Sequence, residues 1–105
     1  MKQNRVHIVI ELADYSELRY IKAFKNKKEA IKFMRNYDTQ YDLFINSDFY
    51  IENYDIDKVY IIKTAEWDLQ ATNSVKISKN EANKLATKLS KSTIGKVRVY
   101  EIPLT

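Results

Sequence analysis

The sequence predicts an α+β domain in which an antiparallel sheet carries two helices on one face. Two observations support this class. Apolar residues alternate with polar ones at 6–12, 18–24 and 97–102, and they recur every three or four residues at 30–37 and 82–89. The order strand, strand, helix also occurs twice. Because each helix has one apolar stripe to bury, both helices can pack side by side on one face of a sheet.

The first ββα unit is predicted over 5–38. The run 6–12 has the period of a half-buried strand, although Val9 interrupts its polar face and indicates burial on both sides. The run 18–24 follows a polar turn at 13–17 and is predicted as its hairpin partner. Asn26 and Glu29 have capping-box spacing, so a helix should begin there. Its apolar stripe consists of Ala30, Phe33, Met34 and Tyr37.

The second ββα unit is predicted over 58–105, together with a last strand. Residues 58–62 align with 5–9, which indicates an internal repeat. A strand is expected near 70–77. Ser78 and Glu81 form a second capping box, followed by the stripe Ala82, Leu85, Ala86 and Leu89. The last strand, at 97–102, is ended by Pro103.

The segment 39–57 between the units is predicted as an acidic aromatic insert within one domain, 1–105. Tyr41, Phe44, Ile45 and Phe49 are spaced as on a helix, and Thr39 could cap it. We therefore expect a short helix over 40–46.

Charge is segregated along the chain. Residues 36–57 contain six acidic and no basic side chains, whereas the chain as a whole has a formal net charge of +4. A solvated surface normally mixes both signs, so this segment is predicted to contact a basic protein partner, with Tyr41 and Tyr50 as anchors. The predicted partner-binding residues are Asp38, Tyr41, Asp42, Asp48, Tyr50, Glu52, Tyr54, Asp55 and Asp57. The alternative is that these side chains are ordinary solvated surface.

Enzymatic chemistry is not expected. The chain has one histidine, one glycine and no cysteine, which disfavours catalytic triads, phosphate-binding loops and thiolate metal sites. Asn53, Asp55 and Asp57 alternate as at the start of a calcium loop, but the glycine that the loop needs is missing. We predict no catalytic residue, no metal and no cofactor.

Two other functions stay open. Lys84, Lys88 and Lys91 recur on the polar face of the second helix and could bind the phosphates of a nucleic acid. A homodimer could instead form through an exposed edge strand, such as the last one.

The expected compartment is the cytoplasm. No apolar run reaches the roughly 18 residues of a membrane span, the first residues lead into a strand pattern rather than a signal peptide, and cysteine is absent. In size, in its cysteine-free composition rich in Lys, Ile, Asn, Tyr and Asp, and in its acidic segment, the chain resembles small phage and mobile-element accessory proteins, including anti-CRISPR inhibitors. The resemblance implies stoichiometric inhibition by occlusion of a site on a nucleic-acid-handling host protein.

Overall fold

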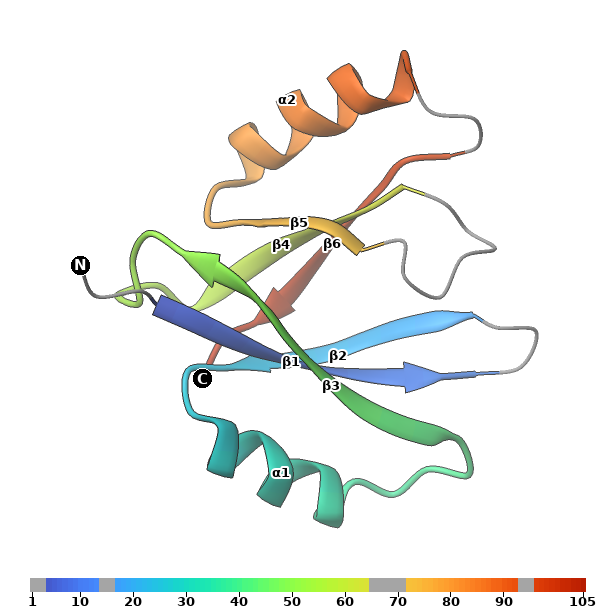
Figure 1. The fold of residues 1–105 in the computed structure, drawn as a ribbon, viewed down its shortest axis with the longest axis vertical. Helices are drawn as coiled ribbons and strands as arrows, with labels where there is room; N and C mark the ends of the chain where they lie inside the picture. The colour runs from blue at the N-terminus through green and yellow to red at the C-terminus, as the bar shows by residue number, and fades with distance from the viewer. Residues whose placement is uncertain (1–3, 14–16, 65–71, 93–95) are drawn as a thin grey trace.

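The computed structural model describes residues 4–13, 17–64, 72–92 and 96–105, and these confirm the α+β class (Figure 1). The elements, in chain order, are β1 (Asn4–Leu12), β2 (Leu18–Phe24), α1 (Lys27–Asn36), β3 (Asp42–Ile51), β4 (Lys58–Lys63), β5 (Thr72–Lys76), α2 (Lys79–Ser90) and β6 (Arg98–Pro103). Parts of the predicted turn at 13–17 and the start of the predicted strand at 70–77 lie outside the described residues. None of the helices in the described ranges is long and apolar enough to cross a bilayer.

The strands form two antiparallel sheets instead of the single sheet predicted. Sheet 1 has the order β2-β1-β3, and sheet 2 has the order β5-β4-β6. The central strands β1 and β4 are buried on both faces, which one sheet with helices on one side could not achieve. Val6, Ile8 and Ile10 of β1 share one core with Ile61 of β4 and Ile102 of β6, so the two sheets pack face to face.

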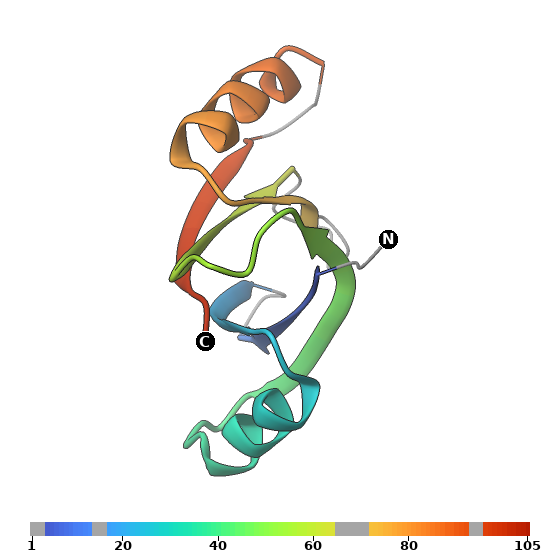
Figure 2. The ribbon, with the colours of Figure 1, turned by 90° about the vertical axis from the view of Figure 1, so that its left-hand side faces the viewer.

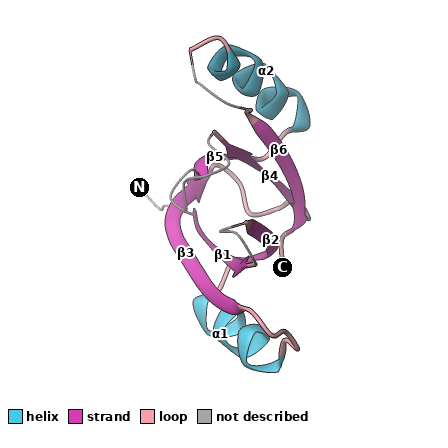
Figure 3. Cartoon of the chain, turned by 90° about the vertical axis from the view of Figure 1, so that its right-hand side faces the viewer, coloured by secondary structure: helices cyan, strands magenta, loops and turns pink. Residues whose placement is uncertain are grey.

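The helices lie on opposite outer faces of this pair of sheets, which corrects the prediction that they share a face. Helix α1 contacts the three strands of sheet 1, and α2 contacts those of sheet 2. In Figures 2 and 3 the strands lie between the two helices. Val9, which interrupts the polar face of β1, packs with Phe24 and Ala30 beneath α1.

The internal repeat is longer than predicted, because each unit is ββαβ. In both units the third strand pairs antiparallel with the first, β3 with β1 and β6 with β4. The N-caps Asn26 and Ser78 occupy equivalent positions, and the fully buried Ala30 and Ala82 follow each cap by four residues. The acidic aromatic segment is therefore largely the third strand of the first unit rather than an insert.

The predicted short helix over 40–46 is wrong, because these residues lead into and form part of β3. The strand carries one extra residue relative to β1 between Asn46 and Phe49, so its two-residue period changes phase there. Phe44 and Phe49 consequently share one face although five positions separate them. The bulge hides the strand period and leaves a spacing that resembles a helix.

The two units meet at two seams of different character. At the first seam the chain end adds to β2: Leu104 forms a parallel bridge with Ala23, and Thr105 N donates to Ala23 O at 2.9 Å. The equivalent seam lies between β3 and β5. Within the described ranges, no backbone hydrogen bond joins β3 to β5. Among the described residues, the side of β3 that faces away from β1 therefore has no backbone partner.

Candidate functional site

The edge of β3 that has no backbone partner among the described residues, which we call the free edge, borders a groove. The groove has a volume of about 510 Å³ and is lined by the run 44–49 of β3, by Lys27 at the start of α1 and by Thr72 at the start of β5. Six successive residues of one strand therefore form its wall, so the groove follows the strand edge. We call the surface formed by Asp42–Ile51 and this groove the β3 edge.

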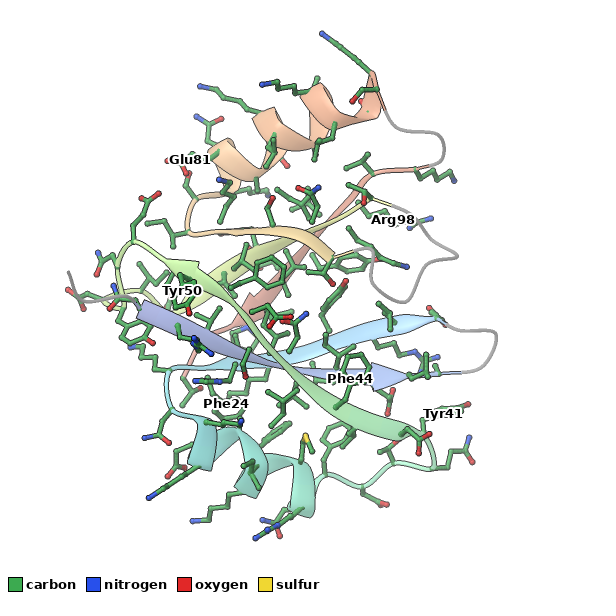
Figure 4. The ribbon with its side chains drawn as sticks, in the orientation of Figure 1. Phe24, Tyr41, Phe44, Tyr50, Glu81 and Arg98 are labelled. Carbon is green, nitrogen blue, oxygen red and sulfur yellow. The ribbon has the colours of Figure 1, made fainter. Side chains whose placement is uncertain are left out.

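Two large apolar side chains are exposed on the β3 edge. Phe44 is 38% exposed and Tyr50 is 42% exposed, and Figure 4 labels both along β3. Phe44 lies opposite Ile10 on the face toward sheet 2. Phe44 was not predicted as a binding residue, because its spacing with Tyr41 and Ile45 fits a short helix.

Tyr50 packs against Arg5. The guanidinium carbon of Arg5 lies 4.9 Å from the centre of the Tyr50 ring, and Arg5 Nη2 donates a hydrogen bond to Tyr50 Oη. A ring fixed in this way loses little conformational entropy on binding a partner. Tyr50 therefore keeps its predicted place on an accessible surface.

The six acidic side chains of the segment are all exposed, and none forms an ion pair with a residue in the described ranges. They do not form one compact patch. Asp42 and Asp48 belong to β3, Asp38 precedes the strand, and the other three follow it: Glu52, Asp55 and Asp57. Because β3 has 10 residues, which corresponds to about 33 Å, the acidic groups form a line rather than a cluster.

Tyr41 and Tyr54 pack against cations of the protein itself. The Arg19 guanidinium lies 5.7 Å from the Tyr41 ring centre, and Lys25 Nζ lies 5.9 Å from that of Tyr54. The Tyr54 hydroxyl donates to the backbone oxygen of Arg5, and burial raises the Tyr54 pKa. Both rings thus fix the segments that lead into and out of β3.

Glu11, a buried carboxylate, anchors the connection before β3. It accepts hydrogen bonds from Arg19 Nη1 at 3.4 Å and from Thr39 Oγ1. Thr39 Oγ1 in turn accepts a bond from Tyr41 N at 3.1 Å. No local pattern indicates this contact, because Thr39 fits a helix cap equally well.

His7 and Ser47 form a pair at the bulge of β3. His7 Nδ1 lies 2.7 Å from Ser47 Oγ. Burial is the main cause that lowers the His7 pKa, and the positive charges of Lys27 and Arg5 lower it further. In the described part of the chain no carboxylate contacts this imidazole, so the pair lacks the group that orients a catalytic histidine. The contact attaches the bulge to β1.

The lysines of α2 lie on a different part of the molecule. Lys84, Lys88 and Lys91 are exposed, and none pairs with a carboxylate in the described ranges. Lys84 and Lys88 border a shallow groove of about 310 Å³ that is also lined by Lys76, Leu85 and the carboxylate Glu81. Lys76 was not predicted to join this set.

The last strand, β6, was predicted as a possible edge for a homodimer. It is followed directly by Leu104, which forms a bridge with Ala23. Among the described residues, no three His, Asp or Glu side chains gather closely enough to hold a metal ion. Comparison with known proteins finds no matching family model, curated protein or solved structure.

Proposed function

We propose that this protein is a non-enzymatic binding protein whose β3 edge docks on a basic partner protein. One observation carries the proposal: exposed carboxylates and exposed aromatic rings occur together along a strand edge that has no backbone partner in the described part of the chain. Phe44 and Tyr50 supply apolar contact area. Asp42 and Asp48 supply charge complementary to a basic surface.

The charge distribution of the protein favours specific binding of one partner over non-specific binding of basic proteins. The chain as a whole has a net charge of +4. Along β3 itself the only charged side chains are the acidic Asp42 and Asp48, whereas the groove beside the strand also includes Lys27. Such an arrangement orients the approaching partner and raises the association rate for one geometry.

The resemblance to phage and mobile-element inhibitors suggests the partner class. We propose a nucleic-acid-handling host protein, because carboxylates along a rigid strand can occupy a groove that normally binds phosphates. In this role the protein acts stoichiometrically, by occlusion. It would compete with nucleic acid for the partner.

A charge-neutral variant of the edge tests the proposal. The double change Asp42→Asn and Asp48→Asn removes two exposed carboxylates, and the matched control Glu81→Gln with Glu101→Gln removes two from sheet 2 and α2. Affinity capture from nuclease-treated lysate of the host cells should recover a basic protein with wild type and control, and at least about fivefold less with the edge variant. Equal recovery by the edge variant, with the fold intact by circular dichroism, contradicts the proposal.

Nucleic-acid binding through α2 is the second candidate. It is favoured by one specific observation: Lys76 of β5 extends the lysine face of α2 at the groove that Lys84 and Lys88 border. If nuclease treatment removes every captured protein, and if neutralising Lys84, Lys88 and Lys91 removes salt-dependent binding to DNA or RNA, this second function replaces the first.

A further inference from the structure

We infer that the partner contributes an extended basic segment, which adds to the free edge of β3 as an extra strand. This inference rests on the proposed function and specifies how the β3 edge recognises its partner. An open strand edge offers unpaired N–H and C=O groups in a row, and an added strand satisfies them with main-chain hydrogen bonds.

The protein already uses this kind of contact at its other seam. There the chain end adds to β2, with Lys25 N donating to Thr105 O and Thr105 N donating to Ala23 O, both at 2.9 Å. The internal repeat makes β2 equivalent to β5 and β6 equivalent to β3. The described residues close the first seam with backbone hydrogen bonds, whereas at the second seam β3 and β5 contact each other without one. The groove of about 510 Å³ lies along this open seam.

The bulge sets the length of strand that can pair. Because β3 carries its extra residue between Asn46 and Phe49, the regular ladder positions before it are Asp42–Asn46. Asp42 and Phe44 project from the same face of the strand, opposite Leu12 and Ile10. An added strand should therefore place a basic side chain beside Asp42 and an apolar one beside Phe44, two positions apart.

Charge disfavours pairing between the β3 edges of two copies of the chain. Pairing of two β3 edges would bring two lines of exposed carboxylates together, with Asp38, Asp42, Asp48 and Glu52 on each side. Like charges across a strand pair are destabilising, and the bulge also interrupts a symmetric ladder. The carboxylates that prevent self-pairing are the ones that select a basic strand.

A short peptide with N-methylated variants tests strand addition. The probe is a fluorescent, acetylated peptide, Thr-Lys-Thr-Val-Thr-Lys-Thr, which places both lysines and the valine on one face and reads the same in both directions. One variant carries methyl groups on the backbone amide nitrogens of Lys, Val and Lys. The other carries them on the backbone amide nitrogens of three Thr residues. Alternate amides of a strand point to opposite edges. N-methylation should therefore weaken binding by about tenfold or more in one variant and by less than about twofold in the other.

The outcomes separate this inference from the proposed function. The probe should bind wild type and the control (Glu81→Gln, Glu101→Gln) alike, and bind more weakly to Asp42→Asn with Asp48→Asn. If both methylated peptides bind alike while the edge variant still loses the captured partner, strand addition is wrong and the docking function stands. Absence of saturable peptide binding, or a concentration-dependent dimer that protects β3, also overturns the inference. Loss of the carboxylate effect in the capture experiment overturns the proposed function itself.

Discussion

Buried polar residues on the outer face of sheet 1 determine where β3 lies. His7 contacts Ser47 at the bulge, and Glu11 binds Thr39 just before the strand begins. Both side chains are buried and both have a hydrogen-bond partner, as buried polar groups require. The sequence showed that His7 and Glu11 alternate with apolar residues. Their partners Ser47 and Thr39 lie 40 and 28 positions away, and no local pattern indicates them.

The pKa of His7 should be visible in the pH dependence of stability. Burial, with Lys27 and Arg5 nearby, lowers this pKa below its ordinary value of 6.5. Between the folded and unfolded pKa values the unfolded chain binds more protons, so the free energy of unfolding falls as the pH drops below about 6.5. We expect the Tm to fall between about pH 7 and pH 5, and to fall less in His7→Gln. Equal slopes in thermal unfolding of the two proteins would show that His7 does not contribute.

Regular periods explain which elements were predicted correctly. Strand β1 and helices α1 and α2 keep one period from end to end, and both helix N-caps were located at Asn26 and Ser78. Strand β2 carries one extra residue, Ile21, opposite the step from Val9 to Ile10, but the apolar and polar residues of its sequence still alternate. Strand β3 changes phase at its bulge, so its period is irregular and it was mistaken for an insert with a short helix. The exposure of its carboxylates was predicted, because charge segregation does not depend on secondary structure.

The apolar stripe of α2 is buried less completely than predicted. Ala82 is fully buried, whereas Leu85 and Leu89 are only half-buried. The outer face of sheet 2 includes the polar residues Ser74 and Lys76 of β5. The apolar surface beneath α2 is therefore smaller than the apolar stripe of the helix.

Two substitutions on α2 should therefore differ in effect. Ala82→Asp buries a carboxylate with no partner and should cost about 3 kcal/mol or more, a large share of the roughly 5–15 kcal/mol typical of such a domain. Leu85→Asp can turn its carboxylate toward water and should cost clearly less. Urea unfolding of both variants measures the difference. Equal losses, or a larger loss for Leu85→Asp, would mean that α2 packs through a different face.

The whole molecule has two sheets where one was predicted, although one feature of the sequence is typical of two. The apolar runs 6–10 and 59–62 leave few polar positions, which is typical of strands buried on both faces. Covering both faces of two such strands takes four stacked layers, and in this molecule they are α1, sheet 1, sheet 2 and α2. The open seam could not be predicted, because it depends on how the two units meet rather than on any segment.

Amide hydrogen exchange on the complex with the captured partner shows which surface of the protein docks. If the β3 edge is the docking surface, exchange should slow for amides of Asp42–Ile51, while α2, Lys79–Ser90, exchanges as in the free protein. The protection should alternate along β3, since only every second amide points to the free edge. If α2 is protected and exchange along β3 is unchanged, docking through the β3 edge is wrong and the lysine face of α2 binds the partner.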